Sequence, residues 1–336
     1  VVTGNLDSNT ISLFLGTGAG SLGARTDVVV GNWPSAVLLR DANADGKLDL
    51  LLLRAADQLT VLPGNGNGTF GAATDFDLFP LANPVALAAG DLNGDGKLDL
   101  AVADRSTGEA AVLIGDGLGG FGAPVSYSCG STPVDIATGD LNGDGHLDIA
   151  VINEVGGNFL ATTLLGDGTG AFGAPCSRAT ALYPAGLVAT DVTGDGFTDL
   201  VMTNANTPAY VSIFPGRGGW ITPPAVTAIG AGGSQAYAIH PEEGFAIVNV
   251  RVDGVAQGPL NSYVFSGISA NHRLDVTFGR GPSITGTAGS GQFGPRTDYP
   301  SADDPNMVAI GDVNRDDRPD LVVTNAATNT VTVRLG

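Results

Sequence analysis

Acidic side chains recur at every second position in five short stretches of the chain, a spacing that favours cation binding. The stretches are DANADGKLD (41–49), DLNGDGKLD (91–99), DLNGDGHLD (140–148), DVTGDGFTD (191–199) and DVNRDDRPD (312–320). Ca²⁺ binds about six to eight oxygen atoms, and alternate residues of a tight loop can direct several oxygens at one centre. We therefore predict up to five calcium ions, one for each stretch, and number the stretches loops 1 to 5.

Each loop offers oxygen ligands from its positions 1, 3, 5, 7 and 9. Position 7 contributes its backbone carbonyl, because the ammonium group of Lys97 in loop 2 cannot bind a cation. Gly96 at position 6 allows the positive φ that turns the chain around the ion. The predicted metal ligands are Asp41, Asn43, Asp45, Lys47, Asp49, Asp91, Asn93, Asp95, Lys97, Asp99, Asp140, Asn142, Asp144, His146, Asp148, Asp191, Thr193, Asp195, Phe197, Asp199, Asp312, Asn314, Asp316, Arg318 and Asp320.

Loops 4 and 5 depart from this pattern. Thr193 replaces the amide at position 3 of loop 4, which predicts a weaker site. Asp317 replaces glycine at position 6 of loop 5, but Asp tolerates the left-handed conformation better than most residues. The alternative for every loop is a turn rich in Asp, Asn and Gly that holds no metal. Repulsion among so many carboxylates favours the metal.

The EF-hand, a calcium loop between two helices, does not fit these stretches. Its position 12 is a bidentate glutamate, whereas that position is Leu52 in loop 1 and Val102 in loop 2. The flanking segments are short apolar runs typical of strands. We therefore predict that each loop joins two strands of a β-sheet.

The loops belong to a repeat of about 50 residues. Loops 1 to 4 start at residues 41, 91, 140 and 191. In each repeat an apolar stretch such as PVALAAG leads into the loop, and a second run such as LDLAVAD follows it. A third run ends in glycine (AAVLIG), and a fourth begins with Phe-Gly (FGAPVSY). Four short strands without helical periodicity are typical of a propeller blade, so the predicted fold class is all-β, a β-propeller of four-stranded blades.

The Phe-Gly segments carry a more specific resemblance. Phe121-Gly122-Ala123-Pro124 and Phe172-Gly173-Ala174-Pro175 resemble the FG-GAP repeat of integrin α-chain propellers, found also as VCBS-type repeats in bacterial secreted proteins. The resemblance covers residues 1–216 and 288–336. It implies an extracellular, secreted or cell-surface bacterial protein in which calcium is structural and other loops recognise the partner.

The phase of the repeats predicts about five and a half blades. Residues 1–33 hold the second, third and fourth strands of one unit, and residues 307–336 stop after a third strand. Propellers of the resembled family usually close with seven blades, so we expect a longer polypeptide. Closure at six blades, with strands shared between the ends, is the alternative.

Residues 217–287 interrupt the fourth repeat with an alternation of their own, seen in QAYAIHP and FAIVNVRVDG. This segment resembles the small internalin-B-type repeat of bacterial surface proteins. We predict an inserted β module for recognition or spacing, because exposed hairpins tolerate insertions.

The formal charge of −19 argues against nucleic-acid and direct membrane binding, since such a surface repels phosphate groups. Cys129 and Cys176 are predicted to be inert thiols, with a disulfide as the alternative. The GxGxxG pattern at 66–71 lacks the helix that a dinucleotide site needs, so it is predicted to be a hairpin turn. His240 and His272 lie in the inserted segment without metal-like spacing.

No catalytic motif accompanies these features. The sequence therefore favours a non-catalytic, calcium-binding β-propeller that recognises a protein or glycan ligand. One alternative is a secreted polysaccharide-degrading enzyme, such as a lyase or hydrolase, or its accessory domain. A purely architectural spacer is the other.

Overall fold

The structure, a computed structural model, consists of antiparallel sheets, and the residues it describes contain no helix. None of the described segments could therefore cross a membrane as an apolar helix. The description covers the chain apart from residues 1, 6–7, 17–21, 32, 55–56, 156–157, 181–182, 193–196, 206–208, 215, 217–218, 223–231, 242–244, 269, 271, 281–296, 301–303, 312–319, 326, 329 and 335–336.

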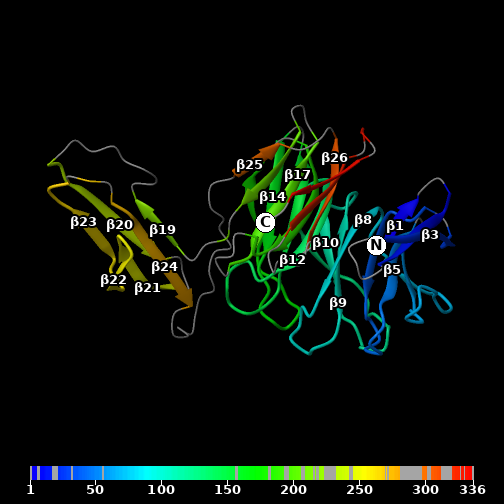
Figure 1. The fold of residues 1–336 in the computed structure, drawn as a ribbon. Helices are drawn as coiled ribbons and strands as arrows, with labels where there is room; N and C mark the ends of the chain where they lie inside the picture. The colour runs from blue at the N-terminus through cyan, green and yellow to red at the C-terminus, as the bar shows by residue number, and fades with distance from the viewer. Residues whose placement is uncertain are drawn as a thin grey trace.

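Four sheets have four strands each, in the order expected for propeller blades (Figure 1). Blade 1 contains β4 (Ala36–Arg40), β5 (Asp49–Arg54), β6 (Gln58–Leu62) and β7 (Thr74–Asp77). Blade 2 contains β8 (Pro84–Gly90), β9 (Asp99–Asp104), β10 (Glu109–Leu113) and β11 (Val125–Ser128). Blade 3 contains β12 (Pro133–Gly139), β13 (Asp148–Val155), β14 (Asn158–Leu164) and β15 (Cys176–Ala179). Blade 4 contains β16 (Pro184–Thr190), β17 (Asp199–Asn204), β18 (Tyr210–Phe214) and β25 (Thr297–Pro300). The all-β prediction with four-stranded blades is confirmed.

Two sheets of three strands flank the blades in the sequence. The N-terminal sheet contains β1 (Val2–Asn5), β2 (Thr10–Gly16) and β3 (Leu22–Val29), and the C-terminal sheet contains β26 (Pro305–Gly311), β27 (Asp320–Asn325) and β28 (Thr330–Arg334). These are the incomplete units expected from the phase of the repeat. The total number of blades and the closure of the ring stay predictions.

The acidic loops connect the first and second strands of each blade. In loop 2, Gly90 at the end of β8 pairs with Asp99, the first residue of β9. The same pairing joins Gly139 to Asp148 and Thr190 to Asp199 in blades 3 and 4. Position 9 of each loop is therefore the first residue of a strand, at one end of the blade.

The second strands are buried on both faces, which explains their unbroken apolar runs. Leu50 and Leu52 of β5 pack with Ile11 of the N-terminal sheet. Leu51 and Leu53 pack on the other side, against blade 2. Each buried leucine contributes about 1.5–3 kcal/mol of transfer free energy. The blades are thus held together by shared apolar layers, and the first strands of successive blades also contact one another.

The inserted segment forms two small sheets that share one core. One sheet has the order β19 (Gly219–Thr222), β20 (Gln235–Pro241), β23 (Ser262–Phe265), and the other has β22 (Val255–Gly258), β21 (Phe245–Val252), β24 (Leu274–Arg280). We call these six strands the inserted sandwich, and Figure 1 shows them to one side of the blades. Blade 4 resumes beyond them, because β18 pairs with β25.

Two smaller predictions are also settled. Cys129 is buried, Cys176 is exposed, and no disulfide joins them. The glycines of the GxGxxG stretch at 66–71 lie in the turn between β6 and β7, where Gly64 bridges to Phe70, so this stretch is a hairpin.

Candidate metal-binding loops

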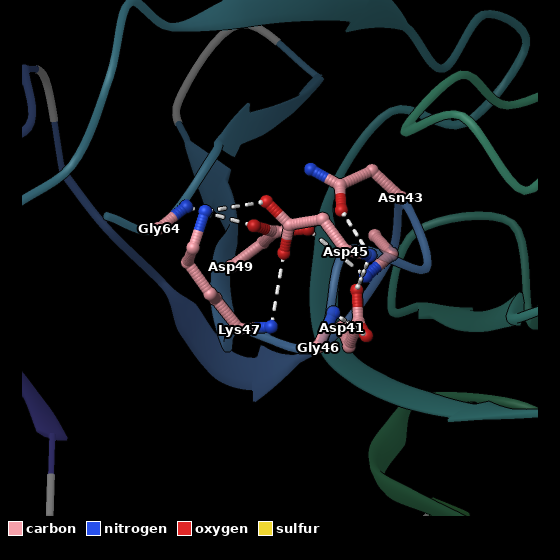
Figure 2. A network of polar contacts seen from close by, with 8 residues as sticks. Asp41, Asn43, Asp45, Gly46, Lys47, Asp49 and Gly64 are labelled. Atoms are coloured by element: carbon pink, nitrogen blue, oxygen red, sulfur yellow. Dashed lines mark hydrogen bonds and ion pairs between the residues drawn. The ribbon is translucent and has the colours of Figure 1, made fainter. Parts of the chain in front are cut away.

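Loop 1 is a tight turn in which side-chain oxygens accept hydrogen bonds from the loop backbone (Figure 2). The two carboxylate oxygens of Asp41 accept the N–H groups of Asp45 (3.1 Å) and Gly46 (2.8 Å). The amide oxygen of Asn43 accepts the same Asp45 N–H (2.9 Å). Asp45 Oδ1 then accepts the N–H of Lys47 (2.9 Å). Positions 1, 3 and 5 are therefore fixed by the turn itself.

Loop 2 makes the same four backbone-to-side-chain hydrogen bonds. The N–H of Asp95 donates to Asp91 Oδ1 (3.0 Å) and to Asn93 Oδ1 (2.9 Å). The N–H groups of Gly96 and Lys97 donate to Asp91 Oδ2 (2.8 Å) and Asp95 Oδ1 (3.0 Å). Identical spacing thus gives an identical turn.

Loop 3 forms a similar turn with partly different contacts. The N–H of Gly145 donates to Asp140 Oδ2 (2.9 Å), and the N–H of His146 donates to Asp144 Oδ1 (2.8 Å). In addition, Asn142 Nδ2 donates to Asp144 Oδ2 (3.0 Å). The outer oxygen of the position-5 carboxylate therefore has an amide partner in this loop.

Position 9 links each loop to the following hairpin. Asp99 is fully buried; its Oδ2 accepts the N–H of Leu92 (2.9 Å), and its Oδ1 accepts the N–H of Gly115 (2.8 Å) at the end of the third strand. A buried carboxylate must have such partners. The same pair of bonds is made by Asp49 with Ala42 and Gly64, by Asp148 with Leu141 and Gly166, and by Asp199 with Val192 and Gly216.

The glycine whose N–H donates to each position-9 carboxylate has no room for a side chain. A Cβ atom on Gly115 would collide with the backbone carbonyl of Leu98, and one on Gly166 would collide with that of Leu147. The sequence showed only that each third strand ends in glycine. Its role, close approach to the loop while donating to the carboxylate, became visible only in the structure.

Burial and mutual repulsion act together on the position-9 carboxyls. Burial raises the pKa of Asp148 to about 7, and the carboxylates of Asp144 and Asp140 add to the rise. The pKa of Asp99 is raised for the same reasons. Positions 1, 5 and 9 of one loop are therefore close enough to repel each other, which a bound cation would relieve.

Position 7 lies over the hairpin of its own blade. The Nζ atom of Lys47 is 3.1 Å from Asp45 Oδ2, and that of Lys97 is 3.2 Å from Asp95 Oδ2. The N–H and then the ammonium of Lys47 hold the pKa of Asp45 below its usual value. His146 is exposed at the equivalent position, and its ring lies against Gly168. Two loops therefore have a side-chain cation on position 5.

The loops also meet the neighbouring blade. The N–H of Gly119, in the hairpin of blade 2, donates to the carbonyl of Ala42 in loop 1 (3.1 Å). The hairpin of blade 3 also approaches loop 2, with the carbonyl of Gly168 near Gly94. Each of these loops therefore lies between two hairpins, and its shape is coupled to the contact between blades.

The structure describes all predicted ligands of loops 1, 2 and 3, and it gathers each set into one turn. Among the described residues, however, no three carboxylate, imidazole or thiol groups are close enough together to hold a metal ion. The donor set is nevertheless oxygen-only, which in kind and sequence order fits a hard cation such as Ca²⁺. Asp191, Phe197, Asp199 and Asp320 are described, whereas Thr193, Asp195, Asp312, Asn314, Asp316 and Arg318 lie outside the described residues.

One buried carboxylate was missed by the sequence reasoning. Asp104, at the end of β9, accepts N–H groups of Ala82, Asn83, Ser106 and Thr107, and also the hydroxyl of Thr107. Burial would raise its pKa, but these donors outweigh burial and lower it. The only signal in the sequence was an Asp at the end of an apolar strand.

The opposite end of the blades has a different character. The segments that lead into β4, β8 and β16 lie at the end of each blade away from the acidic loops. Each carries an exposed aromatic side chain, with exposed fractions of 63% for Trp33, 79% for Phe79 and 56% for Tyr183. Tyr183 also contacts Phe159, with ring centroids 4.9 Å apart. The large exposed side chains at this end are aromatic, whereas those at the acidic-loop end, Leu48 and Leu118, are aliphatic.

A family model described as the FG-GAP-like repeat matches the chain twice, at residues 41–102 and 91–151. These matches include loops 1 to 3 and the four strands of blade 2, about a third of the sequence. The chain therefore carries FG-GAP-like repeats. The internalin-B-type resemblance of residues 217–287 stays a prediction.

Several solved structures are similar to the chain. BBS1N, crystallised in complex with ARL6DN and soaked with mercury, is 14% identical with a TM-score of 0.46, over 100% of this chain and 91% of that one. A chain of a nidogen/laminin complex is 14% identical with a TM-score of 0.34, over 82% and 85%. A chain of the Photorhabdus luminescens Tc holotoxin pore is 15% identical with a TM-score of 0.33, over 62% and 13%. No curated protein matches the sequence.

Proposed function

We propose that this chain is a non-catalytic, calcium-stabilised β-propeller that recognises a protein or glycan outside the cell. The observation that supports calcium is the repeated turn of loops 1 to 3, in which carboxylate and amide oxygens occur at positions 1, 3, 5 and 9. Ca²⁺ prefers such oxygen ligands and tolerates irregular geometry. No cysteine occurs in these loops, which makes a soft metal an unsuitable occupant.

The ion would complete a connection that the polypeptide makes only in part. Asp99 already joins loop 2 to the hairpin that begins at Gly115. A cation held by Asp91, Asp95 and Asp99 would neutralise the repulsion among these carboxylates. Because the folded loop binds the ion and the unfolded chain does not, the binding free energy would add to folding stability.

Isothermal titration calorimetry tests this part of the proposal. Asp95→Ala should remove one calcium equivalent and leave the other sites binding. The matched control is Asp116→Ala, which removes an exposed carboxylate of the same blade whose partners are the N–H groups of Leu118 and Gly120. The control should leave the stoichiometry unchanged. Wild-type protein that takes up no Ca²⁺ would refute calcium binding.

Recognition is proposed for the end of the blades away from the acidic loops. The supporting observation is the exposure of Trp33, Phe79 and Tyr183 there. Aromatic side chains supply large contact area at low conformational cost and are frequent in binding sites. Calcium would act indirectly, by keeping rigid the blades whose far ends carry these side chains.

A binding screen against glycans and extracellular proteins, with calcium and with EDTA, tests recognition. For any ligand found, Trp33→Ala and Phe79→Ala should weaken binding. Leu118→Ala is the matched control, because Leu118 is 82% exposed in a hairpin at the acidic-loop end. Equal loss in all three variants would contradict the proposed face, and no ligand at all would favour a spacer.

A further inference from the structure

Both lysines of the chain occupy the same place. Lys47 and Lys97 are the only lysines in 336 residues, and both stand at position 7 of an acidic loop. A lysine that only keeps the surface solvated has no reason to occur at position 7. The two side chains are also used in the same way, as their contacts show.

Each lysine stem crosses a glycine of the hairpin in its own blade. A Cβ on Gly66 would lie 3.1 Å from Cδ of Lys47, and one on Gly117 would lie 2.9 Å from Cδ of Lys97. Both glycines have positive φ, 77° and 73°. Because these glycines have no side chain, the lysine stem can pass over the hairpin, and its ammonium group lies over the acidic loop.

The ammonium group reaches the position-5 carboxylate, a predicted calcium ligand. The lysine Nζ lies 3.1 Å from Asp45 Oδ2 in loop 1 and 3.2 Å from the equivalent atom of Asp95 in loop 2. Figure 2 shows this contact in loop 1, with Asp45 between Lys47 and the turn backbone. In both loops a positive charge of the protein itself already stands at the oxygen that a metal would need.

Loop 3 has a different residue at position 7. His146 replaces the lysine, its ring lies against Gly168, and the outer oxygen of Asp144 accepts a neutral amide from Asn142 (3.0 Å). Loop 3 therefore keeps the turn of loops 1 and 2 without their tethered cation.

We propose that Lys47 and Lys97 are tethered counter-ions that lower the calcium affinity of loops 1 and 2, so that loop 3 fills before them. This inference rests on the proposed calcium binding. Without metal, the ammonium offsets part of the carboxylate repulsion. A calcium ion must displace the ammonium from Asp45 or Asp95, and it is repelled by the ammonium while it remains nearby. The lysines thus adjust affinity and are not themselves ligands.

The expected effect is moderate because both partners of each ion pair are partly exposed. Exposed pairs are weak, and repulsion across a few ångströms of solvated protein is of similar size. Together they correspond to about a three- to tenfold difference in affinity for each loop. The difference should shrink as salt is raised from about 0.05 M to 0.5 M, because ions screen exposed charges.

Calorimetric calcium titration of the full chain at low salt tests the proposal. Lys97→Gln should raise the affinity of one site about three- to tenfold, whereas Lys97→Arg, which keeps the charge, should stay within about twofold of wild type. His146→Lys should lower the affinity of one site by a similar factor. Both positions are exposed at least in part, so each variant should fold.

The possible results separate the two proposals. Wild-type protein that binds calcium, with Lys97→Gln and His146→Lys unchanged, would overturn the counter-ion role and leave calcium binding intact. An equal gain in Lys97→Gln and Lys97→Arg would also overturn it, because charge would then be irrelevant. Wild-type protein that binds no calcium would overturn the proposed function itself.

A second readout follows the lysines directly. Reductive ¹³C-methylation keeps the charge of each amine, and the chain would give only two lysine signals besides that of its α-amine, assigned with Lys47→Arg and Lys97→Arg. Both lysine signals should move on adding calcium, and they should move at higher calcium than the tightest calorimetric site. Signals that stay fixed through saturation would contradict displacement.

Discussion

The blades and the inserted sandwich are both built from short antiparallel strands, yet different contacts hold them. In blade 2, Asp99 is buried and ties a loop to a hairpin, while Val102 of the same strand is buried between two blades. The inserted sandwich has a small core that includes Val250, and the contact between the side chains of Asp253 and His272 is partly exposed. A repeat can share apolar layers and polar links with its neighbours, whereas an insertion depends on itself.

The largest difference in stability between the blades and the inserted sandwich should come from changing one glycine in each region to alanine. Gly115→Ala should destabilise the blades by about 4 kcal/mol, because the Cβ would collide with Leu98 and would weaken the bond to buried Asp99. Gly254→Ala in the sandwich meets no atom within 4 Å and should cost only about 1 kcal/mol, from its φ of +80°. Urea unfolding measures both, and similar losses would contradict the close-approach argument.

The second-largest difference between the two regions should come from removing calcium. With calcium at about one hundred times the dissociation constant, each ion stabilises the fold by about 2.7 kcal/mol. EDTA should therefore speed hydrogen exchange in peptides from β8–β14 and leave those from β20–β24 nearly unchanged. Added calcium should reverse the effect. Uniform loss of protection would show that the sandwich depends on the blades.

A matched pair of core substitutions should have a smaller effect. Val102 and Val250 are both fully buried, one between blades and one in the sandwich. Each change to alanine should cost about 2 kcal/mol. Val102→Ala should weaken hydrogen-exchange protection in blades 1 and 2, whereas Val250→Ala should weaken it only in the sandwich. Loss in the blades from Val250→Ala would contradict a self-contained core.

The smallest effect should come from pH. Asp135 of β12 accepts the N–H of Leu187 in blade 4, and burial raises its pKa to about 7. A raised carboxyl pKa stabilises the protonated folded state, so Asp135 alone should cost metal-free blades about 1 kcal/mol of stability between pH 6 and pH 8, in addition to the contribution of Asp148.

Asp135→Asn is the control for this pH dependence, and it should reduce the loss. In the sandwich, the N–H of Arg273 and then His272 lower the pKa of Asp253, so that carboxyl should not titrate in the same window. Melting in EDTA at pH 6, 7 and 8 measures the effect. A pH dependence that persists unchanged in Asp135→Asn would refute this assignment.

Much of the fold followed from local pattern. Short apolar runs separated by Gly-rich turns predicted four strands in each repeat. The strand that follows loop 2 begins at Asp99, the last predicted ligand of that loop. The segment FGAPVSY predicted a fourth strand in its repeat, and β11 lies there. Such features depend on residues near one another in sequence, so periodicity reveals them.

Contacts between distant residues were not predictable in the same way. Nothing in the sequence around Asp104 indicated that its carboxylate would accept hydrogen bonds from the segment before β8 as well as from its own turn. Nor did the lysine at position 7 show that it would cross Gly66 or Gly117 to reach position 5. These contacts depend on how the hairpin folds back over the loop, which the strand pattern leaves open.

The sequence by itself determined the repeat, the strands and the order of oxygen-bearing residues in each loop, because these follow from side-chain type and spacing along a short chain segment. Only the tertiary structure decided which backbone groups the buried carboxylates accept, which glycines must lack a side chain, and which loops have a lysine ammonium on position 5. Those choices arise when strands pair and blades pack, since only then are loop and hairpin brought within hydrogen-bond distance.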